Sequence, residues 1–481
     1  MTSTRRSTTL EPLPLPRRAW WYGGALFASS LLLFLVFHSQ LCSEQDQARL
    51  IVQAALGWEQ GEWPNRSYPL RTSPLTLLLL RWALVVGVPL HALPALQGAV
   101  NALSGALAVA LAYLLVRRLI GGPGTLIGGA LVMLNPALWF GATGGMPHVP
   151  SLACFLGALH LYLGGVDARG RARPVRWCLA AALMTVACGI KADIALCSFA
   201  FLGLALMRRE PLSVRTVVPA GLVPLVAIVV TLLLPQVMVP DLEAGFAASW
   251  TGEFPFALHN FFRLPHIRVW ITMFGWAVFL TLPLAVVGAW PHADLRRLLL
   301  LVALWSVPAV LFWGFRFGNS ARHMMASLPP ILLLYAEVVA RRTPPRRASA
   351  LLAGVVIVNV LIGRPHTWTG APSSRLFTSA LMLQDKARLI HAASRQFVLS
   401  TAPRKAWAKP WSSPYTAFET LAATELVSYA DYPPIIVVRR GTHTSQVLLD
   451  APKQDAERLR RDGWEVWPRA DGTGESGTKA R

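Results

Sequence analysis

Long apolar runs, separated by short polar segments, fill the chain up to about residue 363. The runs Trp20 to Leu41 and Val217 to Leu234 each match the roughly 20 residues that a helix needs to cross a hydrocarbon core of about 30 Å. Runs of this kind predict transmembrane helices. The first run is long and lacks a small-residue cleavage pattern, so we interpret it as an uncleaved span rather than a signal peptide.

Short basic clusters between the apolar runs predict how the chain is threaded through the membrane. Loops rich in Lys and Arg stay on the cytoplasmic side, so any two such loops are separated by an even number of crossings. The candidate inside clusters are Arg5 to Arg18, Arg117-Arg118, Arg169 to Arg176, Arg208 to Arg215, Arg296-Arg297 and Arg341 to Arg347.

This parity rule decides two ambiguous segments. Three apolar stretches lie between Arg18 and Arg117, and one of them cannot cross. The weakest is 74–90, which is short and contains Arg81, so we place it on the outer surface as an interfacial helix. The single stretch between Arg176 and Arg208 must turn back at Lys191-Ala192-Asp193, which gives two short crossings.

The predicted fold class is therefore an all-α polytopic membrane protein with about eleven transmembrane helices and a small C-terminal α/β domain. Candidate strands in that domain are Phe397 to Ser400, Pro434 to Arg440 and Glu465 to Pro468. We expect a multi-pass protein of the inner or plasma membrane. Its predicted parts are a cytoplasmic N-terminus (1–19), a transmembrane domain (20–363) with its first outer loop at 42–92, an extracytoplasmic α/β domain (364–470) and a disordered tail (471–481).

Composition agrees with a membrane protein and argues against a nucleic-acid-binding protein. The chain is 54% hydrophobic and 14% charged, with a mean hydropathy of +0.46. Its net charge of +21 could indicate nucleic acid, but the excess Arg recurs in short clusters rather than in one patch. We therefore expect no nucleic-acid partner. The five cysteines show neither metal-ligand pairing nor a secreted disulfide spacing.

The first outer loop contains an amphipathic segment that begins with a carboxylate. From Asp46 to Trp58 the apolar residues recur at helical spacing, which puts Asp46, Arg49 and Gln53 on the opposite face. This pattern predicts a helix on the membrane surface with Asp46 near its N-terminus. Asp46 either caps the helix, where a carboxylate satisfies free N–H groups, or carries out chemistry.

Five short motifs, in order along the chain, resemble those of the GT-C glycosyltransferases. The nearest likeness is to the protein O-mannosyltransferases and the lipid A aminoarabinose transferases, in which an Asp-Glu pair opens the first-loop helix. The motifs are Asp46-Gln47-Ala48-Arg49 with Gly61-Glu62-Trp63-Pro64, Ser73-Pro74-Leu75, Asn135-Pro136, Gly189-Ile190-Lys191, and Arg322-His323 with Pro329-Pro330.

The chain also departs from the family pattern. Gln47 stands where the family has its second acid, and Thr72, beside Arg71, stands where the family often has Lys. The second outer loop, Gly141 to Pro150, contains no acid and offers only His148. A divalent metal is therefore possible but unsupported, we expect no cofactor and no metal site, and a lone His is more often structural.

The resemblance implies a sugar donor carried on a polyprenyl phosphate, because nucleotide sugars are not available outside the cytoplasm. It implies that Asp46 is the general base toward an acceptor hydroxyl. The donor phosphate would be bound by Arg322, Lys191 and Arg316. The membrane lipid is the second partner, and the acceptor is protein, lipid or polysaccharide. Supporting residues are Glu44, Arg49, Arg71, His148 and His323.

Two other functions stay open at this point. A lipid-linked sugar flippase or transporter would also need many spans and outer cations, but it would normally bury ionisable residues near the middle of several spans, and here the span centres are almost free of charge. A catalytically inactive GT-C-like assembly partner fits the missing second acid and the missing Lys.

Overall fold

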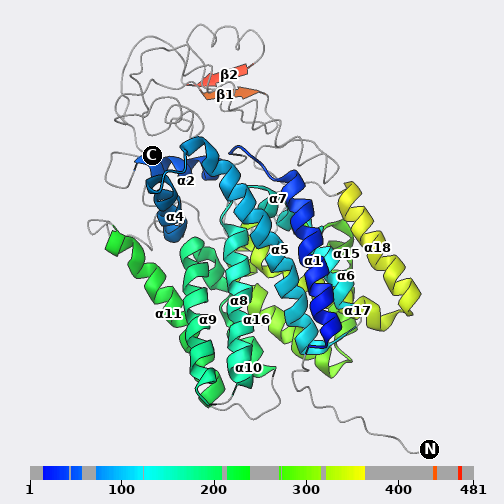
Figure 1. The fold of residues 1–481 in the computed structure, drawn as a ribbon. Coiled ribbons are helices and arrows are strands. Elements are labelled where there is room, and N and C mark those ends of the chain that lie inside the picture. Colours follow the sequence, from blue (N-terminus) through cyan, green and yellow to red (C-terminus); the bar gives the residue numbers. More distant parts are fainter. Residues whose placement is uncertain are drawn as a thin grey trace, which may run out of the picture.

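The part of the chain that a computed structural model describes is almost entirely helical (Figure 1). The structure describes residues 15–42, 45–56, 72–122, 124–168, 170–207, 214–238, 270–271, 274–315, 321–362, 437–440 and 464–467.

The described part of the chain contains the following helices, in chain order. They are α1 (Arg17–Phe37), α2 (Gln45–Leu56), α4 (Pro74–Val85), η1 (Leu90–Ala92), α5 (Leu93–Ile120), α6 (Thr125–Met133), α7 (Pro136–Thr143), α8 (His148–Asp167), α9 (Ala172–Ile190), η2 (Ala192–Cys197), α10 (Phe199–Leu206), α11 (Val214–Met238), α15 (Trp276–Ala289), α16 (Ala293–Phe315), η3 (Ala321–Ser327), α17 (Leu328–Arg342) and α18 (Pro345–Ile362).

The prediction of a multi-pass membrane protein is confirmed. Within the described residues, seven helical segments are long and apolar enough to cross a membrane, or eight if the bent pair α6 and α7 forms one span. Helices α4, η2 with α10, and α15 are apolar but shorter. The seven are Arg17–Phe37, Leu90–Ile120, His148–Asp167, Ala172–Ile190, Thr216–Leu234, Ala293–Phe315 and Arg322–Arg342.

The long helices pack side by side into a bundle. Helices α1, α5, α8, α9 and α11 form a row in which each contacts the next, and α17 packs against α6, α15 and α18 (Figure 1). Close approach requires small residues. A Cβ added at Gly105 of α5 would lie 2.6 Å from the Cβ of Ala142 and 3.1 Å from the ring of Phe34. Glycine therefore lets α5 meet α7 and α1 at this level.

Large apolar side chains cover the outside of this bundle. Helix α11 exposes Val218, Leu222, Leu225, Val229 and Leu233 along its length. A water-soluble domain would bury side chains of this kind, whereas hydrocarbon solvates them. The outer face of the bundle is therefore the face that meets lipid.

One end of the bundle gathers charged residues from several of the predicted inside loops. Glu337, which is fully buried, accepts hydrogen bonds from the backbone N–H of Gly124 (3.0 Å) and from Nε of Arg341 (2.7 Å). Arg341 also pairs with Asp294. A hydrogen bond to α6 and ion pairs between α16 and α17 thus join these helix ends, as expected if the loops share one side of the membrane.

Replacing Glu337 by Gln should destabilise this end of the bundle. The amide keeps the shape but leaves the mostly buried Arg341 with one carboxylate instead of two, and breaking a buried ion pair costs about 3 kcal/mol. We expect the thermal unfolding midpoint of the detergent-solubilised protein to fall by several degrees. Arg342→Gln is the control, because Arg342 is exposed and, among the described residues, binds an uncharged group, the carbonyl of Gly288. Equal midpoints for the two variants would contradict the argument.

The third predicted span is a broken helix. Helices α6 and α7 meet at an angle of 55°. Asn135 stands at the break, and its side-chain oxygen accepts from the backbone N–H groups of Ala137 (2.9 Å) and Leu138 (3.4 Å). Pro136 is the first residue of α7, a position that needs no hydrogen-bonded N–H. The Asn135-Pro136 motif therefore ends one helix and starts the next.

Two of the three predicted C-terminal strands are confirmed. Strands β1 (Val437–Arg440) and β2 (Trp464–Trp467) pair antiparallel, with Val438 opposite Val466. The third candidate, Phe397 to Ser400, lies outside the described residues.

Candidate functional site

The predicted outer segments meet at the other end of the bundle. Five segments that are distant in the sequence contact one another there: α2, the start of α4, the α7–α8 turn, η2 and η3. Four of the five family-like motifs belong to these segments, so their mutual contacts decide whether they can form one site.

Helix α2 begins at Gln45, close to the predicted start at Asp46. Its apolar face is buried, as the pattern predicts, but Gln53 of the opposite face is also buried, with 4% of its surface exposed. The reason is that α2 packs against α4 and α5 rather than lying alone on a surface. Of Asp46 and Arg49 only the backbone is described, and Glu44, Arg71 and Arg316 lie outside the described residues.

The first turn of α2 lies on the second outer loop. Gln47, the neighbour of Asp46, is fully buried and donates to the side chain of Gln97 (3.1 Å). A Cβ added at Gly145 would lie only 1.7 Å from Nε2 of Gln47. The loop therefore has room for the Gln47 side chain because residue 145 is glycine. This contact brings the backbone at Asp46 next to the loop that carries His148.

Helix α4 covers the other end of α2. Arg81 donates to the carbonyls of Ala54 (3.2 Å) and Ala55 (3.0 Å), which lie in the last turn of α2. A cation at a helix C-terminus satisfies free carbonyl groups and the helix dipole. Arg81, whose charge disfavours 74–90 as a crossing, thus binds α2, and α4 itself is only 12 residues long.

The second outer loop is shaped by Asn101 of α5. Its Nδ2 donates to the carbonyls of Gly141 (2.9 Å), Gly144 (2.7 Å) and Met146 (2.6 Å), and the side chain is buried. The two N–H groups of this amide are thus shared among three backbone acceptors at the end of α7 and just beyond it. The position of His148 at the start of α8 depends on this loop.

Replacing Asn101 by Ala should loosen the loop. Buried acceptors left without a donor cost about 1–3 kcal/mol. We expect amide hydrogen exchange of residues 144–147 to become faster and the unfolding midpoint to fall. Thr185→Ala, which removes a hydrogen bond from Thr185 to its own helix (2.9 Å to Ala181), is the control. Unchanged exchange in the loop would show that other contacts hold it.

Lys191 stands at the turn that the parity rule predicts. Helix α9 ends at Ile190, and η2 begins at Ala192. The turn is packed against α4, because the hydroxyl of Thr76 donates to the carbonyl of Ile190 (2.9 Å) and a Cβ at Gly189 would meet Leu75 at 3.1 Å. The motifs Ser73-Pro74-Leu75 and Gly189-Ile190-Lys191 are therefore in direct contact.

The segment η3 carries Arg322 and His323 to the same place. Helix α16 holds it by two bonds, from Nε1 of Trp305 to the carbonyl of Ala326 (2.9 Å) and from Oγ of Ser306 to the carbonyl of Ser327 (3.2 Å). Met325 packs on α7, where a Cβ at Gly141 would lie 2.4 Å from its methyl group.

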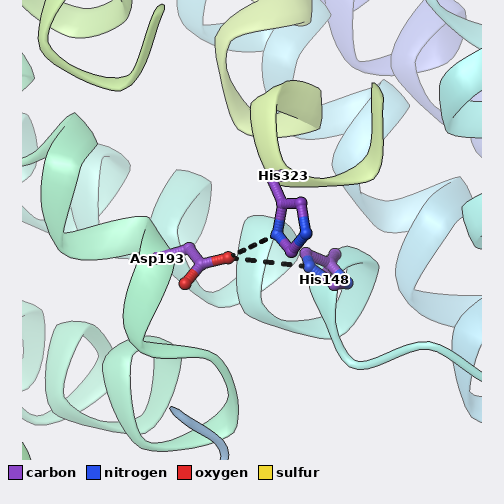
Figure 2. Close-up of side chains that lie close together, drawn as sticks. All are labelled: His148, Asp193 and His323. Atoms are coloured by element: carbon purple, nitrogen blue, oxygen red, sulfur yellow. Dashed lines mark hydrogen bonds and ion pairs between the residues drawn. The ribbon is translucent and has the colours of Figure 1, made fainter. Parts of the chain in front are cut away.

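Asp193 is the centre of a buried polar cluster (Figure 2). Its Oδ2 lies 2.9 Å from Nδ1 of His323, 3.8 Å from Nε2 of His148 and 3.9 Å from Nζ of Lys191. The ring of Trp313 stacks on His323, with 4.0 Å between the centroids. Burial disfavours the charged carboxylate, but Lys191 and the two histidines outweigh it and hold the pKa of Asp193 well below its ordinary value. Asp193 is therefore ionised at neutral pH.

The structure thus brings together Lys191, His148 and His323 among the predicted residues, with Arg322 next in sequence to His323. His148, interpreted from the sequence as a lone histidine, is not alone. Sequence reasoning missed Asp193, although one signal was present: an acid beside a Lys in the middle of an apolar stretch is a functional candidate by default. The three residues His148, Asp193 and His323 offer ligand atoms that all lie within 4.8 Å of one another.

Comparison with known proteins identifies the fold. Residues 97–237 match the family model of dolichyl-phosphate-mannose-protein mannosyltransferases. The chain resembles the crystal structure of ArnT from Cupriavidus metallidurans bound to undecaprenyl phosphate, with a TM-score of 0.53 and 17% identity over 85% of this chain and 75% of that one. The apo state of ArnT gives 0.52 and 18% over the same shares. No curated protein matches the chain significantly.

Proposed function

From the premise that the chain has the GT-C fold, as the sequence predicts and both comparisons confirm, we propose that it is a glycosyltransferase. It transfers a sugar from a polyprenyl-phosphate donor to an acceptor hydroxyl on the extracytoplasmic face. The observation that carries this proposal is the meeting of the family-like motifs at one end of the bundle. Contacts join α2 to the second outer loop, α4 to the Lys191 turn, and that turn to η3.

In the proposed reaction Asp46 takes the proton of the acceptor hydroxyl. The acceptor oxygen then bonds to the anomeric carbon of the sugar, and the bond from that carbon to the phosphate oxygen breaks. The electron pair of the broken bond stays on the phosphate, which gains one negative charge. General-base help of this kind is worth about 10²- to 10⁴-fold in rate.

The charge that develops on the phosphate needs cations within a site that excludes water. Lys191 is buried with 5% of its surface exposed, at the junction of α4, α9 and η2. Arg322 lies on η3, next to His323 of the same cluster. Cations fixed before the reaction stabilise the leaving group without reorganisation. We assign Lys191 and Arg322, with Arg316 from the connection before η3, to the donor phosphate.

The likeness to ArnT supports a lipid donor, because the ArnT crystal structure contains undecaprenyl phosphate. We propose the same class of carrier lipid for this chain, in a bacterial inner or plasma membrane, with the N-terminus cytoplasmic and the C-terminal domain extracytoplasmic. The acceptor is protein, lipid or polysaccharide.

A transfer assay tests the proposal. The purified full chain is reconstituted with radiolabelled polyprenyl-phosphate sugars, namely arabinose, mannose, aminoarabinose and galacturonic acid, together with candidate acceptors of the three classes. We expect label to move to one acceptor class. Absence of transfer with every donor would contradict the proposal and favour an inactive assembly partner. Movement of the intact lipid-linked sugar across a vesicle would favour a flippase.

A further inference from the structure

We propose that His148, Asp193 and His323 form a binding site for a divalent zinc-type metal ion. The three side chains come from three separate segments: the first residue of α8, the turn after α9, and η3. Their side chains are 5%, 6% and 7% exposed, so all three are more than nine-tenths buried. Figure 2 shows both rings directed toward the same carboxylate oxygen of Asp193.

The distances fit a tetrahedral ion. Two ligands of a zinc ion with bonds of about 2.0–2.1 Å lie about 3.4 Å apart. Oδ2 of Asp193 lies 2.9 Å from Nδ1 of His323 and 3.8 Å from Nε2 of His148, on either side of that value. The two histidine nitrogens lie within 4.8 Å of each other, so an ion between them would draw the two rings together around the carboxylate.

The hydrogen bonding of the His148 ring is a second, independent observation. Both of its ring nitrogens are buried and have no hydrogen-bond partner among the described residues. The contact with Asp193, at 3.8 Å, is too long for a hydrogen bond. Buried polar atoms in folded proteins are nearly always paired, so an unpaired imidazole directed at a carboxylate needs a partner. A metal ion between His148 and Asp193 would be that partner.

The chemistry of the donor set favours a transition-type ion such as zinc over magnesium and calcium. Two imidazoles and one carboxylate are typical of zinc sites with three protein ligands, which leave a coordination position for a further ligand. Magnesium and calcium prefer sites built from oxygen alone. Stacking of Trp313 on His323 holds one of the two rings, as the surroundings of metal-binding histidines often do.

Lys191 sets the charge of the proposed site. Its Nζ lies 3.9 Å from the same oxygen of Asp193, so a divalent ion would add to a local positive charge. An anion is therefore the ligand that best completes the coordination. If the proposed function holds, this anion is a phosphate oxygen of the donor; binding of the ion to the three residues does not depend on that function.

Metal binding by the purified full chain tests the inference without any activity measurement. The tag-free protein is stripped with a chelator and titrated with Zn²⁺, and with Co²⁺ as a spectroscopic probe. We expect about one Zn²⁺ per chain, a visible Co²⁺ spectrum of tetrahedral type, and a Zn²⁺-dependent rise in the unfolding midpoint. His148→Gln and His323→Gln should each weaken binding by more than about 100-fold, above the usual effect of outer-shell partners.

His160→Gln is the matched control, because His160 lies on α8 like His148 but binds the carbonyl of Leu111 (2.9 Å). It should bind Zn²⁺ like wild type. Wild-type protein that takes up no stoichiometric Zn²⁺, or His148→Gln that takes up as much as wild type, would overturn the inference. If a variant does not fold, the Zn²⁺ stoichiometry and the Co²⁺ spectrum of the wild type still test whether the chain holds a tetrahedral metal site.

Discussion

Replacing Asp46 by Asn should lower the turnover of sugar transfer by at least about 100-fold while leaving the KM for the donor within a factor of a few. The amide has nearly the same shape but cannot accept the proton of the acceptor hydroxyl, and general-base catalysis is worth about 10²- to 10⁴-fold. The donor phosphate would still meet its cations, so binding should persist. Steady-state kinetics with a radiolabelled polyprenyl-phosphate sugar measure both quantities.

The matched control for this change is Asp167→Asn. Asp167 ends α8 at the opposite end of the bundle, where it pairs with Arg118. The same chemical change there should leave turnover near that of wild type. If Asp46→Asn retains full turnover, Asp46 is not the base and its carboxylate only caps α2. If Asp46→Asn abolishes donor binding as well, the role of Asp46 is structural rather than catalytic.

The helical architecture could be predicted because its signals are local. An apolar run of sufficient length and a basic cluster next to it are both read within a few tens of residues. The turn at Lys191 illustrates this: counting crossings between Arg176 and Arg208 requires a reversal there, and α9 ends at Ile190 with η2 starting at Ala192. The same count predicts that 74–90 does not cross, and α4 is only 12 residues long.

The composition of the polar cluster could not be predicted in this way. His323 and Asp193 are 130 positions apart in the chain, and their contact depends on how η3 docks on α16 and α7. The second outer loop has no acid of its own, so the sequence predicts an isolated His148, whereas the acid beside it comes from the turn after α9. Gln53 gives the same lesson, since periodicity defines a face of α2 but not the helix that covers it.

The assignments of Asp46, Glu44, Arg49, Arg71 and Arg316 stay predictions. They rest on the likeness of sequence motifs, and the structure describes either no part of these residues or their backbone alone. What supports Asp46 is its neighbour: Gln47 is buried against Gly145, so the start of α2 is placed beside the loop of His148.

Lys191→Met should raise the KM for the donor and also lower turnover, whereas Asp46→Asn lowers turnover alone, because we assign Lys191 to the donor phosphate both when it is bound and when it leaves. Methionine is unbranched and only one atom shorter than lysine, so it fills most of the same buried space but removes the charge that we assign to the donor phosphate. A hydrogen bond to a charged group is worth about 1.5–3 kcal/mol, which corresponds to a rise of about 10- to 100-fold in the KM for the donor and in the Kd for polyprenyl phosphate. Arg342→Met, at the other end of the bundle, should change neither.

Lys191 also lies 3.9 Å from Asp193, so it could act by neutralising that carboxylate instead of binding the phosphate. A further pair of variants separates these two roles. Asp193→Asn and the double variant Lys191→Met/Asp193→Asn complete a mutant cycle for the Kd of polyprenyl phosphate. If Lys191 only neutralises Asp193, the double variant should bind the lipid as well as Asp193→Asn does. If Lys191 binds the phosphate, the double variant should bind about 10-fold or more weakly than Asp193→Asn, because the missing charge then acts on the lipid and not on the carboxylate.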